Sequence, residues 1–185
     1  MDIALIIIGV IVLIIVIWFI ASYNSFVRLR NNVREGFSTM DVYLKKRWDL
    51  IPNLVETVKG YAAQEKETLE GVTALRSGAY DQMTPADKIA ANQDLTGALS
   101  RLLMLSENYP DLKSNQNFMD LSNQLKKIEE DIANARKYYN AVVKTLNNKV
   151  QMFPSNIIAG MFKFTEEKMF EVASDTEREN VKVQF

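Results

Sequence analysis

The sequence predicts an all-α protein in which an N-terminal transmembrane helix precedes an elongated up-and-down bundle of three to four long helices. Two observations support this fold class. Residues 3–21 form an apolar run without a charge, an amide or a proline, and three later stretches repeat apolar residues at spacings of three and four. Such stripes must be buried against one another. We therefore divide the chain into a transmembrane anchor at 1–22, a helical bundle domain at 23–173 and a flexible tail at 174–185.

The apolar run is long enough to cross a bilayer, because a helix of that length covers about 30 Å. Trp18 and Tyr23 fall where the helix leaves the hydrocarbon, and aromatic rings are favoured at that interface. The alternative is a cleaved secretory signal, which would have a basic start, a shorter apolar core and a small-residue cleavage site. Asp2 is the only charge before the run. We therefore expect an uncleaved signal-anchor and a single-pass protein of the cell membrane.

Basic residues near the two ends of the run predict its orientation. None precedes it, whereas Arg28, Arg30 and Arg34 follow it. Because Lys and Arg are retained on the cytoplasmic side, we expect the N-terminus outside and the bundle domain in the cytoplasm. The same three arginines could also face anionic lipid headgroups, at about 1 kcal/mol for each basic residue. The other interpretation is a solvated helix face that serves as a topology signal.

The first periodic stretch predicts one long helix that reaches about residue 62. Its stripe keeps its register past Pro52, although proline removes one hydrogen bond and disfavours helix in the residue before it. A kinked continuous helix is therefore favoured. The alternative is a break, with Asp49 capping a new helix that starts near Pro52. The stripe consists of Phe26, Leu29, Val33, Phe37, Met40, Leu44, Trp48, Ile51, Val55, Val58 and Ala62.

The second stretch predicts a helix that starts with Thr84 as N-cap and Pro85 at the first helical position. Asp87 falls in its first turn, and the helix should end near Tyr109, because Pro110 disfavours helix in the residue before it. Its stripe is Ile89, Leu95, Leu99, Leu102, Leu103 and Ser106.

The third stretch is the most regular, and its seven-residue pattern predicts a narrow apolar seam of the coiled-coil type. The seam consists of Phe118, Leu121, Leu125, Ile128, Ile132, Ala135, Tyr139, Val142, Leu146 and Val150.

An apolar block at 153–164 follows, and its Pro and Gly make it too interrupted for a membrane span. We expect a short helix that Gly160 terminates, and then a second short helix at 165–172 with Thr165 as its cap. The rings are expected to cover one end or flank of the bundle. The alternative is an exposed apolar patch for a partner.

Polar residues around Pro52 form the candidate site. We expect a polar network there that either ties helices together or forms part of an interaction surface. The network consists of Asp41, Lys45, Arg47, Asp49, Pro52, Asn53 and Glu56.

The absence of His and Cys excludes several kinds of chemistry. Di-iron bundles, zinc hydrolases and Ser-His-Asp or Cys-His nucleophile sets all need one of these residues. No phosphate-binding glycine loop is present, and the acidic run at 129–131 is interpreted as a solvated helix face because adjacent helical residues point in different directions. With a pI of about 5.6 and no binding motif, nucleic acid is not expected as a partner. We predict no catalytic residue, cofactor, metal or small-molecule substrate.

Several segments resemble one bacterial family along essentially the whole chain. Tyr-Asn-Ser-Phe-Val at 23–27 follows the apolar run at once, and residues 40–61 read MDVYLKKRWDLIPNLVETVKGY. Tyr-Tyr-Asn at 138–140, Phe-Pro-Ser-Asn at 153–156 and Phe-Lys-Phe at 162–164 complete the pattern. These motifs resemble the LemA family of membrane proteins, although Asn180 stands where that pattern leads us to expect proline. The resemblance implies a cytoplasm-facing helical bundle on a single anchor, in a family without a settled enzymatic activity.

Together, these observations predict a membrane-anchored helical scaffold or interaction protein without catalytic activity. Its expected partners are the bilayer and either another protein or a second copy of this chain. The alternative is a membrane-surface module that organises or senses anionic lipid through the basic stretch after the anchor.

Overall fold

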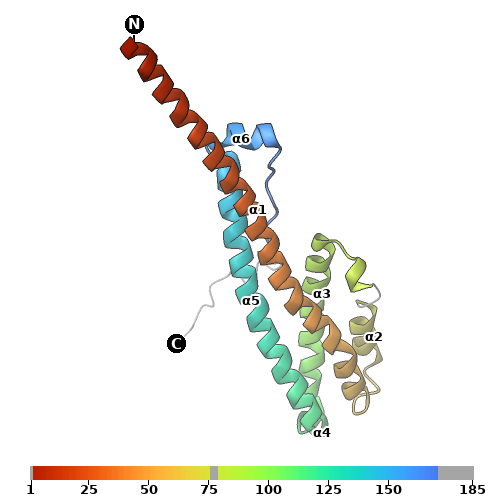
Figure 1. Cartoon of the computed structure of the whole chain (residues 1–185). Coiled ribbons are helices and arrows are strands. Elements are labelled where there is room, and N and C mark those ends of the chain that lie inside the picture. The colour runs from red at the N-terminus through yellow and green to blue at the C-terminus, as the bar shows by residue number, and fades with distance from the viewer. Residues whose placement is uncertain (1, 76–78, 171–185) are drawn as a thin grey trace, which may run out of the picture. The chain divides into compact units, whose positions relative to one another are not determined.

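The computed structural model describes residues 2–75 and 79–170, and it confirms the all-α class, because no strand occurs among these residues. The expected tail at 174–185 and Asn180 lie outside the described residues. Figure 1 shows the helices in chain order: α1 (Asp2–Lys59), α2 (Lys66–Ala74), the 3-10 turn η1 (Tyr80–Gln82), α3 (Pro85–Leu105), the 3-10 turn η2 (Ser106–Asn108), α4 (Pro110–Lys113), α5 (Gln116–Gln151) and α6 (Ser155–Phe162).

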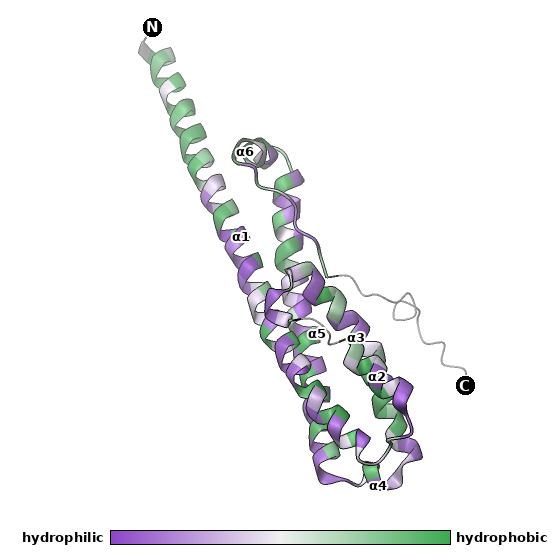
Figure 2. Cartoon of the chain, turned by 90° about the vertical axis from the view of Figure 1, so that its right-hand side faces the viewer, coloured by the Kyte–Doolittle hydropathy of each residue, from purple (hydrophilic) through white to green (hydrophobic). Residues whose placement is uncertain are grey.

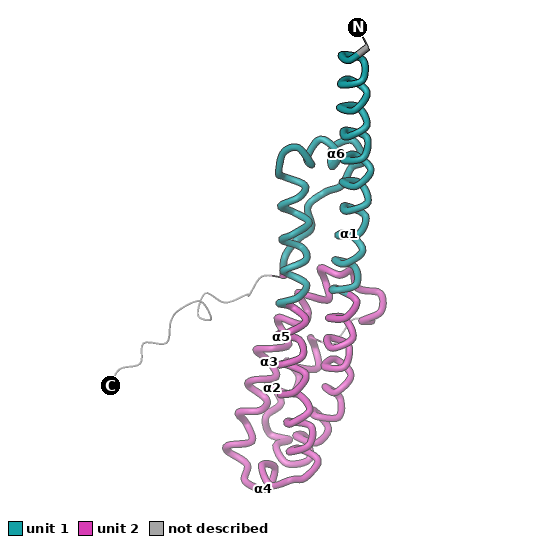
Figure 3. The backbone as a smooth tube through the Cα atoms, turned by 60° about the vertical axis from the view of Figure 1, so that its left-hand side comes forward, with its two compact units in different colours: residues 1–37, 137–169 teal, residues 38–136, 170–185 magenta. Residues whose placement is uncertain are grey.

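The chain forms two compact units, which Figure 3 shows in different colours. Unit 1 consists of Met1–Phe37 and Lys137–Met169, and unit 2 of Ser38–Arg136 and Phe170–Phe185. Helices α1 and α5 each contribute one part to unit 1 and the other part to unit 2.

In unit 1, the first part of α1 carries the apolar run, which is green in Figure 2. An 18-residue window of this helix has a mean hydropathy of 3.6, and none of that window is buried. Among the described residues, α1 is the one helix that is long and apolar enough to cross a membrane. The segment is therefore a candidate membrane anchor.

Helix α1 continues through Pro52 to Lys59, so the favoured prediction of one continuous helix is confirmed and the alternative break is wrong. Most of the predicted stripe is buried, with Leu29, Phe37 and Val55 partly exposed, and Leu54 is buried although the prediction omitted it. Leu54 lies between the stripe positions 51 and 58, at the spacing that keeps side chains on one helix face.

The start of α3 matches the prediction. Pro85 is its first residue, the Thr84 hydroxyl accepts a hydrogen bond from the Asp87 amide, and the Asp87 carboxylate accepts one from the Thr84 amide. The helix ends at Leu105, four residues before the expected stop. Pro110 instead opens the short helix α4, where its fixed φ suits a first helical position.

Helix α2 was not predicted. It has 9 residues, and only Leu69 and Val72 are buried in it, so it lacks the long apolar stripe that identified the other helices. A helix this short depends on packing against its neighbours, which its own sequence does not encode.

The seam of α5 shifts near its C-terminal end. Val143 is buried where the seven-residue pattern placed Val142, which is partly exposed. A straight α-helix drifts by about 20° per heptad against a strict repeat of seven. Over the three heptads that precede this position, the drift reaches about 60°, which is more than half of the roughly 100° between consecutive residues.

The end of unit 1 corrects two predictions. Helix α6 runs past Gly160 to Phe162, and it stops at Lys163, which has the left-handed φ of 56°. The Phe164 amide donates to the carbonyl of Ala159 at 2.9 Å, as in a Schellman C-cap. Residues 165–170 are not helical, so the helix predicted there is wrong for these residues; 171 and 172 lie outside the described part.

Hydrogen bonds from α5 explain why the segment after α6 is extended. The Asn147 side chain accepts from the Glu167 amide at 2.9 Å and donates to the Glu167 carbonyl at 2.8 Å. The Tyr139 hydroxyl donates to the carbonyl of Lys168 at 3.0 Å. These bonds satisfy backbone groups that a helix would otherwise pair.

Candidate functional site

Arg47 lies at the centre of unit 2, with 2% of its surface exposed. Its Nε donates to Asn92 Oδ1 at 3.1 Å, and its Nη2 donates to Asn92 Oδ1 at 2.9 Å and to the Asn92 backbone carbonyl. Its Nη1 donates to Thr96 Oγ1 at 3.0 Å and to Glu129. All five donors of the guanidinium are therefore paired.

This arrangement joins three helices, because Arg47 belongs to α1, Asn92 and Thr96 to α3, and Glu129 to α5. A buried charge is costly unless its hydrogen bonds are satisfied. The geometry therefore fixes the register of α1 against α3 and α5 within unit 2.

Asp41 organises a second polar cluster, six residues before Arg47 on α1. Its Oδ1 accepts from the Tyr80 hydroxyl at 2.7 Å, and its Oδ2 forms an ion pair with Lys88 Nζ at 2.8 Å. Lys88 Nζ also lies 4.7 Å from the centre of the Tyr80 ring. The centres of the Trp48 and Tyr80 rings are 5.4 Å apart. Burial, and then the hydrogen bond to Asp41, raise the pKa of Tyr80 far above its ordinary value.

One of the other predicted network residues reaches the Asp41 cluster, because Lys45 Nζ lies 5.8 Å from the centre of the Tyr80 ring. Lys45 and Asp49 form an exposed ion pair with each other at 2.7 Å. The Asn53 carbonyl accepts from the Thr57 hydroxyl at 2.7 Å, which is contact within one helix. Pro52 and Glu56 line a groove instead.

Sequence reasoning missed five residues of the two clusters. Asn92 interrupts the apolar stripe of α3 between Ile89 and Leu95, and a polar residue at such a position was the available signal. Glu129 was assigned to a solvated face together with Glu130 and Asp131, but it forms an ion pair with the buried Arg47. The missed residues are Tyr80, Lys88, Asn92, Thr96 and Glu129.

The groove lies between the end of α1 and α2, and its volume is about 510 Å³. We call it the α1–α2 groove. Ile51, Pro52, Val55 and Leu69 supply apolar surface, and charged side chains surround it. Its lining is Ile51, Pro52, Val55, Glu56, Lys59, Ala63, Lys66, Leu69, Glu70 and Thr73.

The three arginines after the apolar run lie in unit 1 and are exposed. The Arg30 guanidinium lies 5.4 Å from the centre of the Phe164 ring. No group of three or more His, Cys, Asp or Glu that could hold a metal ion occurs in the part of the chain that the structure describes.

Comparison with known protein families gives a match over most of this chain. The family model described as LemA family matches residues 36–185, which is most of the sequence. The chain belongs to the LemA family. Within it, Protein LemA of Metamycoplasma hominis is 25% identical over 167 residues, which cover 88% of this chain and 74% of that protein.

Two magnetosome proteins are also similar. Magnetosome protein MamQ 2 of Paramagnetospirillum magneticum is 26% identical over 175 residues, which cover 80% of this chain and 64% of that protein. Magnetosome protein MamQ of Magnetospirillum gryphiswaldense is 26% identical over 174 residues, with the same coverage of 80% and 64%. The chain thus spans 64% of the length of these MamQ proteins. Membership of the LemA family and the candidate anchor fit a membrane-associated protein.

The LemA family match has a boundary that bears on the site. It starts at residue 36, so it includes the Arg47 and Asp41 clusters, the α1–α2 groove and α6. It leaves out the candidate span and Arg28, Arg30 and Arg34.

Proposed function

We propose that this LemA family protein is a membrane-anchored helical scaffold that binds another protein through unit 2 and has no catalytic activity. One observation carries the proposal. Helix α1 runs without a break from the candidate span to Lys59, and its second part supplies Arg47 and Asp41 to the core of unit 2. The anchor and the binding module are thus connected by helix rather than by a flexible linker.

The α1–α2 groove is the surface that we assign to the partner. Its apolar centre includes Val55, Pro52 and Leu69, and its rim carries Glu56, Lys59, Lys66 and Glu70. An apolar centre with a polar rim of both charges is the usual composition of a protein interface.

Site-specific photo-crosslinking in the native cell tests this proposal. A photoreactive benzoylphenylalanine replaces Glu70 on the groove rim, and the matched control carries it at Glu130, an exposed glutamate of α5 outside the groove. We expect a discrete crosslinked protein at position 70 and none at position 130. Equal crosslinking at both positions, or none at position 70, would remove the groove as the partner site.

The proposed topology places the N-terminus outside the cell and unit 2 in the cytoplasm, because the basic residues all follow the apolar run. The chain has no cysteine, so a single cysteine at the exposed Asp94 of α3 reports one site. An impermeant maleimide should label it only after the cells are opened. Labelling of intact cells would reverse the orientation.

A second candidate function is the sensing of anionic lipid. It is favoured by the exposure of Arg28, Arg30 and Arg34 on the same unit that carries the candidate span. In full-length protein reconstituted in vesicles, a fluorescent label at the exposed Asn31 should respond to anionic lipid and lose this response at high salt. Replacing the three arginines with glutamine should abolish the response. If the fluorescence of the label does not change with lipid charge, this function is contradicted.

A further inference from the structure

Helix α6 has an unusual composition for a surface helix. It contains no charged residue from Ser155 to Phe162, and only Ile158 and Ala159 are buried in it. The exposed apolar side chains around it form what we call the α6 patch. The patch consists of Met152 (62% exposed), Phe153 (79%), Ile157 (53%), Met161 (62%) and Phe162 (44%).

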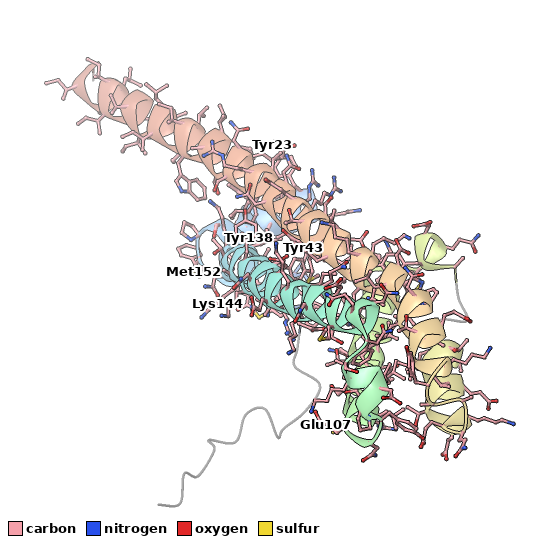
Figure 4. The ribbon with its side chains drawn as sticks, turned by 90° about the horizontal axis from the view of Figure 1, so that it is seen from below. Tyr23, Tyr43, Glu107, Tyr138, Lys144 and Met152 are labelled. Carbon is pink, nitrogen blue, oxygen red and sulfur yellow. The ribbon has the colours of Figure 1, made fainter. Side chains whose placement is uncertain are left out.

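The α6 patch lies at the end of the apolar run of α1. The Phe162 ring centre is 5.9 Å from that of Phe19 and 4.7 Å from that of Tyr23. A surface groove of about 570 Å³ is lined by Trp18 together with Met152 and Phe153. Figure 4 labels Tyr23 and Met152, which bound this region on α1 and after α5. The patch is therefore level with the residues where a spanning helix would leave the hydrocarbon.

The direction of α6 also fits this level. Figure 1 shows α6 lengthwise, crossing the direction of α1, and Figure 2, turned by 90°, looks along its axis. A helix that crosses the span rather than following it lies near the plane of the bilayer. An interfacial helix takes this orientation, with its apolar face in the boundary between headgroups and acyl chains.

Two basic residues lie next to the patch. Lys163 follows α6 directly and is exposed. Lys149 Nζ donates to the Ser25 hydroxyl at 2.6 Å and lies 5.4 Å from the centre of the Phe26 ring. Aromatic rings with basic groups beside them are typical of the membrane interface, where the cations reach the phosphates.

We propose that α6 is a second membrane contact, in which the α6 patch inserts into the acyl boundary of the leaflet where the span ends. This inference rests on the proposed membrane anchor. The bilayer is favoured over a protein as the occupant because α6 has no charged residue, and because Met152 and Phe153 of the patch share a groove with Trp18 at the end of the apolar run. Two contacts in one leaflet would prevent α1 from rotating about its own axis.

Fluorescence quenching in vesicles tests the inference on the full-length chain. Single cysteines, each carrying an environment-sensitive label, replace Met161 in the patch and Met104 in α3, which are both methionines with 62% exposure. A third label at Ile11 in the apolar run reports the anchor itself. The vesicles contain phosphatidylcholine with or without a nitroxide on the acyl chain, and iodide serves as the aqueous quencher.

We expect the labels at Met161 and Ile11 to be quenched several-fold more strongly by the nitroxide lipid than by iodide, with blue-shifted emission. The label at Met104 should show the reverse. A label at Ile157, on the same face of α6, should repeat the Met161 result.

Three results would overturn the inference. If Met161 behaves like Met104 while Ile11 contacts lipid, α6 does not insert, although the anchor stands. If Ile11 itself is open to iodide, the proposed anchor fails as well. If Met161 is shielded from both quenchers, or two copies crosslink through it, then a protein covers the patch instead of the bilayer.

Discussion

Units 1 and 2 are built from the same two long helices but are stabilised in different ways. In unit 1, rings pack between α1 and the segment after α6: Phe26 and Phe164 stack with their ring centres 4.8 Å apart. In unit 2, buried hydrogen bonds and ion pairs join the helices, with Arg47 and Asp41 at their centres. The contacts of α1 therefore differ between its part in unit 1 and its part in unit 2.

The difference follows from what each kind of contact provides. Aromatic packing stabilises mainly through buried area and tolerates small displacements. A fully paired guanidinium adds little net stability, but it penalises every arrangement that leaves a donor unpaired. Unit 2 should therefore lose its defined register when Arg47 is truncated, whereas unit 1 should respond mainly to lost volume.

The largest effect is expected from Arg47→Ala. It leaves the Asn92 and Thr96 oxygens and Glu129 without their common donor and opens a cavity, so we expect unit 2 to lose about 3–5 kcal/mol. Chemical unfolding in detergent micelles gives the free energy, and hydrogen exchange shows whether the loss is confined to residues 38–136.

Arg30→Ala is the matched control, because Arg30 is an exposed arginine of the same helix. Its contact with the Phe164 ring should be worth about 0.5–1 kcal/mol. Equal effects of the two substitutions would mean that the buried network does not distinguish unit 2 from unit 1. Arg47→Lys should fall between them, since a lysine cannot reproduce the planar fork.

Phe26→Ala tests the other half of the comparison. The ring is fully buried against Phe164, so its removal should cost about 3 kcal/mol or more in unit 1. Hydrogen exchange should rise in residues 137–151 of α5 and stay unchanged in 116–136. Phe26→Leu keeps much of the volume and should cost less. An equal rise along all of α5 would show that the two units do not respond separately.

Most of the fold could be predicted from the sequence, because long helices repeat apolar residues at spacings of three and four. The α1 stripe, the cap at Thr84 and the seam of α5 depend on spacings within one segment. Helix α2 was missed because a helix this short depends on packing against its neighbours. A helix was wrongly predicted at 165–170, because that segment is held extended by Asn147 and Tyr139, which are distant in sequence.

Only the α1 residues of the candidate site could be predicted from the sequence. Arg47 and Asp41 lie in the most distinctive stretch, so they were singled out together with neighbours such as Asp49 and Asn53, which bond within α1. Their partners are 39–82 positions away, and apart from Asn92, which interrupts the apolar stripe of α3, nothing in the local pattern of α3 or α5 indicates which polar residue meets them. Predicting such pairs requires the packing of the helices and not only their periodicity.

Tyr80→Phe should have a smaller, pH-dependent effect. It removes the 2.7 Å hydrogen bond to Asp41 and should cost about 1.5 kcal/mol at neutral pH. Because burial and Asp41 raise the pKa of Tyr80, the folded state keeps the proton at a pH where the unfolded chain has lost it. The contribution is thus complete below pH of about 10 and declines above it, by up to about 1.4 kcal/mol per pH unit.

The measurement for Tyr80 is the difference in unfolding free energy between the wild type and Tyr80→Phe, followed from neutral to alkaline pH. Subtracting the variant removes the titration of the other tyrosines and the lysines. A difference that stays constant above pH of about 10 would contradict the assigned role of the hydroxyl. Lys88→Met, which removes the second partner of Asp41, should lower stability at neutral pH.

The smallest effect has the opposite sign and belongs to unit 1. Lys163 holds a left-handed φ of 56°, which costs a residue with a Cβ about 1 kcal/mol relative to glycine. Lys163→Gly should therefore stabilise unit 1 by about that amount while keeping the C-cap of α6. Lys144→Gly provides the control, since Lys144 is an exposed lysine inside α5, where glycine should destabilise by roughly 0.5–1 kcal/mol. Opposite signs in the same micelle unfolding assay would show that backbone conformation, and not the loss of a lysine charge, determines the result.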